Sequence, residues 1–226
     1  MDADLRAPGW DFPGVRHGFA AEGRAVAAGL HLVRVRQVHG ADCLVADTRT
    51  ESPAGAADAL LTSQPGVAVA IATADCVPLL LAAPADGMVA AVHAGWRGTL
   101  AAIAEAAVRA MGERGVPPER IVAALGPSID GCCYEVEREL ATRFADRFGS
   151  VAWDAWRDGV AGKGCLDLRR MNALILAQAG VPATALQRVG PCTYCGGGPF
   201  ASYRRRGANA GRQLSWIGLA GAEPGS

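Results

Sequence analysis

The sequence predicts a single α/β domain with a mixed sheet, and three observations favour this class. Half of the 226 residues are hydrophobic and 19% are charged, which is enough apolar surface for one substantial core. Short apolar and β-branched runs bounded by turn residues alternate with longer segments of helical spacing. The order strand, helix, strand in residues 88–125 is typical of layered α/β architectures.

The first half of the chain is predicted to consist mainly of strands. These strands cover residues 30–38, 43–46, 67–73, 77–83 and 88–92, and residues 58–62 lead into the third of them through a Pro-Gly turn. Residues 39–42 have the character of a tight turn, so His39 lies at a strand end. Residues 84–87 form a second turn, which would hold Cys76 and His93 near the same edge of a sheet.

The second half mixes helices with short strands. Helices are predicted over residues 99–114, 135–148 and 168–179, and strands over residues 121–125, 185–189, 200–203 and 213–219, with a loop at 153–164. Gly98 or Thr99 would cap the first helix, and Asp167 and Gly180 would bound the last. We expect one domain over residues 1–226, with its core at about 30–217 and flexible ends.

Composition and charge exclude several classes of protein. Basic and acidic residues number 22 each, so no strong electrostatic attraction to nucleic acid or to an anionic membrane is expected. The basic cluster Arg204-Arg205-Arg206 fits a solvated loop at least as well as a binding surface. Residues 1–10 lack the features of a signal peptide, and no apolar stretch reaches the roughly 20 residues of a membrane helix. We therefore expect a soluble, cytoplasmic, monomeric protein.

The residues with the clearest chemistry lie between Ala74 and Leu100. Cys76 and His93 border two neighbouring apolar runs, and His39 lies at an earlier strand end. One Cys and two His are a recurrent zinc ligand set when a fourth position stays open to water or substrate. The spacing alone also allows an inert buried thiol and two hydrogen-bonded histidines, because no local metal-binding motif fixes these residues together.

Charged residues near this stretch are candidates for substrate chemistry. Arg97 lies beside a predicted helix start, where anion binding is favoured. Asp58 and Asp75 lie at strand boundaries and either orient a histidine, accept a proton or cap a turn. Glu135 stands in small or apolar surroundings, where an uncompensated charge is costly.

The remaining cysteines have weaker signals. The seven cysteines form an odd count in a reducing compartment, so a disulfide framework is not expected. Cys192-x-x-Cys195 lacks a second pair of zinc ligands and a redox-motif context, so we interpret it as a structural turn. Cys132 and Cys133 are neighbours that do not easily converge on one metal, and we expect them to pack under Tyr134.

A set of short motifs resembles the YfiH, or laccase-domain, family, in order from about residue 30 to residue 217. The motifs are QVHG from Gln37, ADALLT from Ala57, ADC from Ala74, HAGWRG from His93, LGPSI from Leu125, YEV from Tyr134, Asp167-Leu168 with Asn172, CTY from Cys192 and SYRR from Ser202. The HAGWRG block is the most specific of them.

This resemblance implies a YfiH-type, CNF-like α/β sandwich, related in fold to bacterial toxin deamidases that use a Cys-His pair. It implies zinc held by His39, Cys76 and His93, with Cu2+ able to occupy the site in vitro. We expect catalytic roles for Cys76, His93, Arg97 and Asp75, and substrate contacts from Gln37, Asp58, Arg97 and Glu135.

The resemblance implies three activities, and the residues help to rank them. Four histidines cannot ligate the four coppers of a multicopper oxidase. We expect a zinc-dependent purine nucleoside phosphorylase that uses adenosine, inosine, guanosine or methylthioadenosine with phosphate, and deaminates adenosine as a side activity. The alternatives are an amidase that edits UDP-muramoyl-peptide precursors of peptidoglycan, copper-loaded polyphenol oxidase activity, or a binding module without catalysis.

Overall fold

The computed structural model describes residues 4–24 and 27–221. Within them the strands are β1 (Val15–Phe19), β2 (His31–Arg34), β3 (Cys43–Val45), β4 (Ala59–Thr62), β5 (Val67–Thr73), β6 (Val77–Ala83), β7 (Met88–Ala94), β8 (Val122–Leu125), β9 (Glu135–Glu137), β10 (Trp156–Asp158), β11 (Lys163–Leu166), β12 (Leu186–Arg188) and β13 (Gln213–Leu219). The α-helices are α1 (Trp96–Leu100), α2 (Ile103–Gly112), α3 (Arg138–Phe148), α4 (Leu168–Gln178) and α5 (Tyr203–Arg206).

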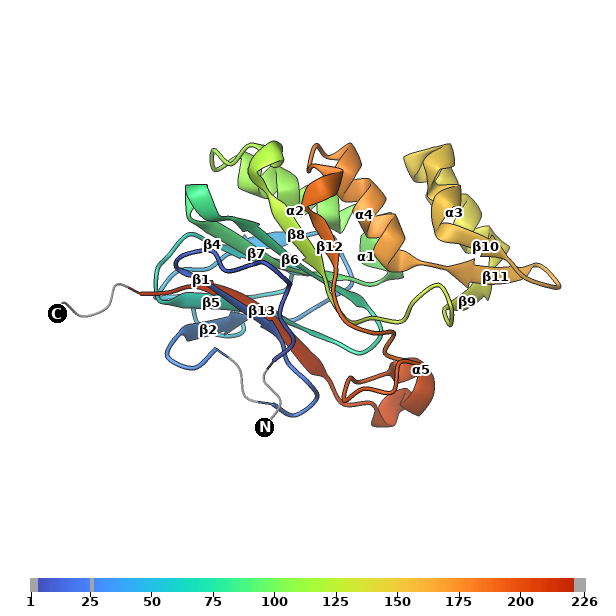
Figure 1. Cartoon of the computed structure of the whole chain (residues 1–226), viewed down its shortest axis with the longest axis horizontal. Coiled ribbons are helices and arrows are strands. Elements are labelled where there is room, and N and C mark those ends of the chain that lie inside the picture. The colour runs from blue at the N-terminus through green and yellow to red at the C-terminus, as the bar shows by residue number, and fades with distance from the viewer. Residues whose placement is uncertain (1–3, 25–26, 222–226) are drawn as a thin grey trace.

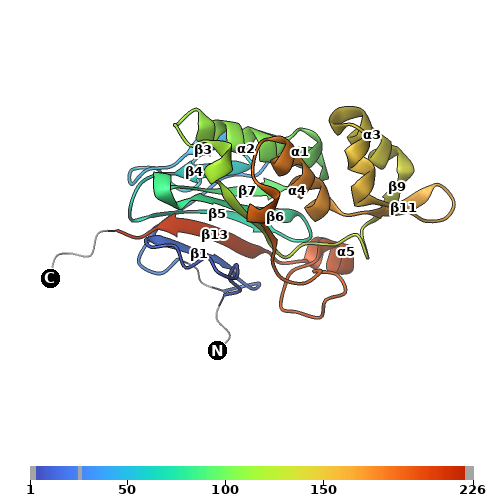
Figure 2. The same ribbon diagram turned by 45° about the horizontal axis from the view of Figure 1, so that its top comes forward.

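The elements form three layers, with helices α1, α2 and α4 above a six-stranded sheet and a four-stranded sheet beneath it (Figure 1). The upper sheet has the order β12-β8-β6-β7-β4-β3, and the lower sheet has the order β1-β13-β5-β2. Both sheets mix parallel and antiparallel pairs, as predicted. Helix α3 packs against the small sheet β10-β11-β9 at one end of the molecule (Figure 2).

The alternation of side chains along β6 explains the two cores. Every residue of β6 is buried, because one face meets helices and the other meets the lower sheet. Leu79 and Leu81 join the core beneath α2 and α4, whereas Leu80 and Ala82 join the core between the sheets. The upper sheet is therefore a rigid, doubly covered platform, and side chains at its strand ends are held in fixed positions.

Two predicted helices differ from the structure. The segment 99–114 is broken, because Ala102 adopts a left-handed conformation with φ of 64° and separates α1 from α2. The break leaves α1 against the loop of His39, where a Cβ at Gly98 would lie 3.0 Å from the carbonyl oxygen of Gly40. In the segment 135–148 the first three residues pair with β11 instead of continuing the helix.

The end of the chain departs from the prediction in two further places. The segment 153–164 is not a loop, because it contains β10 and the start of β11, which are too short to show an alternating pattern. The segment 200–203 is not a strand, because the Ser202 hydroxyl accepts the N–H of Arg205 and starts α5. Helix α4 is confirmed, with Asp167 as N-cap and Gly180 at φ of 97°.

The ends of the chain were predicted to be flexible. That prediction falls partly on residues 1–3 and 222–226, which lie outside the described residues, as do residues 25–26. Strand β1, which the sequence did not indicate, pairs along its whole length with β13. None of the described helices has the length and apolar character needed to cross a membrane.

Candidate functional site

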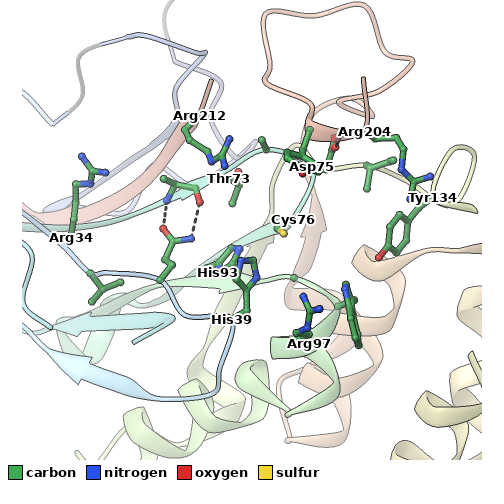
Figure 3. Close-up of a pocket in the computed structure, with 18 residues that line it drawn as sticks. Arg34, His39, Thr73, Asp75, Cys76, His93, Arg97, Tyr134, Arg204 and Arg212 are labelled. Atoms are coloured by element: carbon green, nitrogen blue, oxygen red, sulfur yellow. Dashed lines mark hydrogen bonds between the residues drawn. The ribbon is translucent and has the colours of Figure 1, made fainter. Parts of the chain in front are cut away.

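Two histidines and one cysteine from separate parts of the chain meet at one end of the upper sheet (Figure 3). One ligand atom from each of His39, Cys76 and His93 lies within 4.8 Å of the others. The rings of the two histidines meet edge to face, with centroids 4.8 Å apart. We call these three residues the His-Cys cluster.

Strand register brings the cluster together. In the β6–β7 pair Pro78 lies opposite His93, so Cys76, just before β6, lies near the His93 side chain. The predicted approach of Cys76 and His93 across a two-strand turn is therefore confirmed. His39 lies in the loop after β2 with φ of 60°, a conformation that turns the chain toward the strand ends.

Asp58 fixes both histidines. Its fully buried carboxylate accepts the N–H groups of Val38, His39 and Gly40 at 2.7–3.1 Å, which holds the His39 loop. It also accepts Nδ1 of His93 at 2.7 Å, and its own carbonyl oxygen accepts the His93 N–H. Because Nδ1 is engaged, Nε2 of His93 is the nitrogen left for a metal or a proton.

The two histidines have opposite pKa shifts. Burial alone would lower the pKa of His93, but hydrogen bonds to Asp58 and Cys76 outweigh it and raise the pKa to about 9. Burial and the neighbouring His93 lower the pKa of His39. In the absence of a metal the cluster therefore holds one protonated and one neutral imidazole at neutral pH.

The space inside the cluster suits a metal ion. A Cβ on Gly95 would lie 2.9 Å from the Cys76 sulfur and 3.2 Å from Nδ1 of His39, so only glycine keeps this space clear. One thiolate and two imidazoles favour zinc, and three protein ligands leave a position for water or substrate. Metal-binding histidines usually donate their other ring N–H to a carboxylate, and Asp58 occupies this position beside His93.

The cluster opens into a cavity of about 750 Å³. Four arginines line it, Arg34, Arg97, Arg204 and Arg212 (Figure 3). Among the ion pairs of the described residues, none involves these four side chains. A cavity with several unpaired guanidinium groups favours an anionic small molecule.

Arg97 lines this cavity. The prediction placed it beside the start of a long helix, which the described residues do not form there. Arg97 lies inside α1, which has five residues, and its guanidinium stacks on the Trp96 ring at 4.4 Å. The break at Ala102 removes the extended dipole that the prediction relied on. The guanidinium itself is then the group that attracts an anion.

The other predicted site residues have mainly supporting contacts. Gln37 lines the cavity, but both ends of its amide bond the backbone of Ala72, at 2.8 and 2.7 Å. Asp75 lines the cavity with φ of 81°, and accepts the Thr193 hydroxyl and the Arg204 N–H, each at 2.6 Å. These contacts hold the chain from Thr193 to Arg204 over the cavity.

Asp58 and Glu135 do not line the cavity that the described residues form. Asp58 is fully buried, so it positions the histidines and has no access to a substrate. Glu135 is exposed, and its backbone carbonyl oxygen accepts Arg204 at 3.4 Å. A substrate bound in this cavity would therefore not reach Asp58, and a contact with Glu135 would lie outside the cavity lining.

Sequence reasoning missed several residues of the cavity. Arg34 and Arg212 are exposed residues of ordinary strands and loops, and nothing in their local pattern distinguishes them from solvated side chains. Arg204 belongs to the basic cluster that the sequence left open between a solvated loop and a binding surface, and Tyr134 was noted as part of a motif and as a packing partner of two cysteines. Their proximity depends on the packing of the lower sheet and of the Thr193–Arg204 segment.

The interpretation that Cys192-x-x-Cys195 lacks a second pair of possible zinc ligands is wrong. One sulfur atom from each of Cys132, Cys133, Cys192 and Cys195 lies within 4.8 Å of the others. The segment after β8 and the segment after β12 run side by side, because these strands are parallel neighbours. The second pair that a zinc site would require is thus supplied by a distant part of the chain.

The fold and the His-Cys cluster together define a mixed α/β protein with a thiol and two imidazoles at the base of an arginine-lined cavity. A family model described as "Multi-copper polyphenol oxidoreductase laccase" matches residues 17–220. The chain belongs to this laccase-domain family, as its motifs indicated.

Relatives of known name and structure agree with this assignment. A "Purine nucleoside phosphorylase" of Deinococcus radiodurans is 40% identical over 203 residues, covering 89% of this chain and 72% of the relative. "Adenosine deaminase RL5", from an unknown prokaryotic organism, is 38% identical over 194 residues, 82% of this chain and 74% of the relative. The crystal structure of YlmD from Geobacillus stearothermophilus superposes with a TM-score of 0.86 at 27% identity and 97% coverage of both chains. The predicted YfiH-type fold is confirmed.

Proposed function

We propose that this chain is a zinc-dependent purine nucleoside phosphorylase that also deaminates adenosine. The substrates in this proposal are phosphate and adenosine, inosine, guanosine or methylthioadenosine. The observation that carries it is the position of the His-Cys cluster at the base of a cavity with four arginines that have no carboxylate partner in the described structure. The names of the Deinococcus relative and of RL5 support the same two activities.

Arginine side chains would bind the phosphate in this proposal. A guanidinium donates paired hydrogen bonds to phosphate oxygens, and a partly closed cavity strengthens them relative to water. Arg97 is closest in sequence to the cluster, and its stacking on Trp96 restricts the guanidinium before an anion binds. Arg204 is restricted in a similar way over the Tyr134 ring, at 5.2 Å.

Aromatic side chains would bind the nucleoside in this proposal, and the metal-binding residues would take part in its reaction. Trp96 and Tyr134 line the cavity and offer flat apolar surface to a purine. His39, Cys76 and His93 would hold the zinc ion, and Asp58 keeps the His93 ring in the orientation that directs Nε2 at it. When bound, zinc supplies Lewis-acid polarisation for bond cleavage and activation of water for deamination.

A product assay tests this proposal. Zinc-loaded protein is incubated with each of the four nucleosides, with and without phosphate, and the products are separated by chromatography. We expect free base only when phosphate is present, together with ribose 1-phosphate, or methylthioribose 1-phosphate in the case of methylthioadenosine, and we expect inosine from adenosine without phosphate. Absence of base release from every nucleoside by zinc-loaded protein would overturn the proposal.

One observation favours a second function, that of an amidase acting on a cell-wall precursor. Cys76, His93 and Asp58 form a series of hydrogen-bonded thiol, imidazole and carboxylate groups, which resembles the arrangement of cysteine hydrolases. In that function Cys76 is the nucleophile and His93 the base. Metal content separates the two functions, because a thiolate that ligates zinc is not free to attack a carbonyl carbon.

The family's printed description as a multicopper oxidase does not fit these residues. The chain has four histidines, and His17 and His31 are not part of the cavity lining. His17 is buried against Trp10, and its Nε2 accepts the N–H of Ala7. The His-Cys cluster could hold a single copper in vitro, because copper exceeds zinc in intrinsic affinity for such ligands.

A further inference from the structure

Four cysteines, two of them exposed, gather between two loops outside the arginine-lined cavity. Cys132 and Cys133 follow β8, and Cys192 and Cys195 follow β12. The sulfur of Cys132 lies 3.4 Å from that of Cys133 and 3.6 Å from that of Cys195. Sulfur atoms around a tetrahedral zinc lie about 3.8 Å apart, given zinc–sulfur bonds of about 2.3 Å. We call these four residues the four-cysteine cluster.

A buried arginine holds the two loops in place. Arg169 is 1% exposed and pairs with Asp130 in the first loop. Its remaining donors bond the carbonyl oxygens of Val189, Gly190 and Pro191 in the second loop, at 3.1–3.2 Å. The cysteine pairs are therefore brought together by protein contacts alone, so the cluster is preorganised.

The second loop folds into a tight turn that places Cys192 and Cys195 on the same side as the first loop's cysteines. The N–H of Gly196 bonds the carbonyl oxygen of Cys192 at 2.9 Å, which folds the C-x-x-C segment back on itself. A Cβ at Gly196 would lie 2.5 Å from that oxygen, so the turn requires glycine. The sulfur of Cys192 accepts the N–H of Asp130 at 3.4 Å, the type of bond that stabilises a thiolate.

We propose that Cys132, Cys133, Cys192 and Cys195 bind one zinc ion in a closed tetrahedral thiolate site that stabilises the wall of the cavity. Binding replaces the four thiol protons by one Zn2+, releases those protons to solvent and leaves a net charge of −2 on the site. Arg157 lies beside it and donates to the carbonyl oxygen of Gly131 at 3.2 Å. Cys132 and Cys195 are exposed, which gives the ion a path of entry.

The ion would connect two segments that reach the cavity. Tyr134 follows Cys133 directly and lines the cavity. Thr193 lies between Cys192 and Cys195, and its hydroxyl bonds Asp75. A metal that joins the two loops therefore restrains one aromatic side chain and one carboxylate of the cavity without contacting a substrate.

Metal content of full-length variants tests this site. Metal-free protein is reconstituted with excess zinc under reducing conditions, desalted and assayed for zinc per chain. Cys132→Ser/Cys195→Ser should contain one zinc fewer than wild type, whereas Cys43→Ser, which changes a cysteine outside both clusters, should lose none. His39→Ala/His93→Ala should keep the zinc of the four-cysteine cluster even if the proposed nucleoside activity does not exist.

A second measurement keeps all four cysteines, so it remains informative if the Cys132→Ser/Cys195→Ser variant does not fold. His39→Ala/His93→Ala protein is titrated with Co2+, and thiolate-to-cobalt charge-transfer absorption is recorded. A band that saturates at one cobalt per chain, with the intensity of a tetrathiolate site, supports the proposal. Equal zinc content in wild type and Cys132→Ser/Cys195→Ser would overturn it, as would a disulfide between two of these cysteines in reduced, zinc-treated protein.

Discussion

The two clusters that contain cysteine differ in the number of metal ligands they offer and in whether a cavity adjoins them. The His-Cys cluster offers three ligands at the base of a cavity, so a bound metal keeps an open position. The four-cysteine cluster offers four ligands between two surface loops, which leaves no position for substrate. Open sites are typical of catalytic zinc and closed sites of structural zinc. In the two proposals made above, the number of ligands, more than the presence of cysteine, distinguishes the catalytic site from the structural one.

The largest expected effect comes from removing a ligand of the open cluster. His93→Ala should lower phosphate-dependent base release by about 10²–10⁴-fold, because it removes a zinc ligand and the proton-carrying imidazole together. Steady-state kinetics on inosine measures this loss. His31→Ala changes an exposed histidine of β2 and should retain wild-type rates. Equal activity in His93→Ala and His31→Ala would show that the His-Cys cluster is not the reaction centre.

Arg169→Met probes the scaffold of the closed cluster. It leaves the buried Asp130 with Arg188 alone and removes the donors to three carbonyl oxygens, so the free energy of unfolding should fall by about 3 kcal/mol. Arg170→Met, one residue further on and exposed, is the matched control. Denaturant unfolding measures both variants, and similar stability for the two would contradict the role of Arg169.

Asp58→Asn separates orientation from ligation in the open cluster. The amide keeps the size of the side chain but loses the charge that raises the His93 pKa, so zinc affinity and activity should fall by about 10–100-fold. Competition with a fluorescent chelator measures the affinity. Asp47→Asn, at an exposed turn, should leave the zinc affinity unchanged. An unchanged zinc affinity in Asp58→Asn would show that Asp58 does not orient the metal-binding histidine.

Arg97→Gln tests the anion side of the cavity. Loss of one guanidinium should raise the KM for phosphate about tenfold with a smaller change in kcat, since a charged hydrogen bond contributes about 1.5–3 kcal/mol. Arg49→Gln, in an exposed turn, should not change this KM. A KM for phosphate that stays constant while the KM for nucleoside rises would assign Arg97 to the nucleoside instead.

The pH dependence of metal-free protein tests the His93–Asp58 pair without a change of sequence. The pKa of His93 is raised to about 9 from an ordinary value of 6.5, so its protonated pair with Asp58 stabilises the fold fully below about pH 6.5. This contribution is lost as pH rises through about 9. Thermal unfolding should therefore show lower stability at pH 10 than at pH 7, with a smaller difference in Asp58→Asn. Zinc affinity of the His-Cys cluster should rise over the same interval, because the proton on His93 competes with the metal.

The two clusters also differ in how far the sequence predicts them. Cys76 and His93 were predicted to meet, because a short turn between two apolar runs fixes their strands side by side. The four-cysteine cluster was missed, because the approach of Cys132 to Cys195 depends on the parallel pairing of β8 with β12 across about sixty residues. Local patterns do not encode such long-range neighbours. Arg97 was placed near the cluster because it follows His93 closely in the sequence. Arg34 and Arg212, which line the same cavity, were not identified, because they come from distant parts of the chain.

Helix 168–179 and most of the buried strands were predicted because capping residues and apolar periodicity act locally. The break at Ala102 was not predicted, since alanine normally continues a helix and nothing in the local sequence signals the left-handed conformation of this residue. The small β10-β11-β9 sheet was missed because its strands have three or four residues each.

The central claim is that the open His-Cys cluster carries a metal-dependent reaction of purine nucleosides with phosphate. Its most direct test is a zinc titration of metal-free protein while hypoxanthine release from inosine is followed in phosphate. We expect no release without zinc, a rise to a plateau as zinc is added, and no release at any zinc concentration in Cys76→Ala, whereas Cys43→Ala behaves as wild type. Release that is independent of zinc, or that persists in Cys76→Ala, would contradict it.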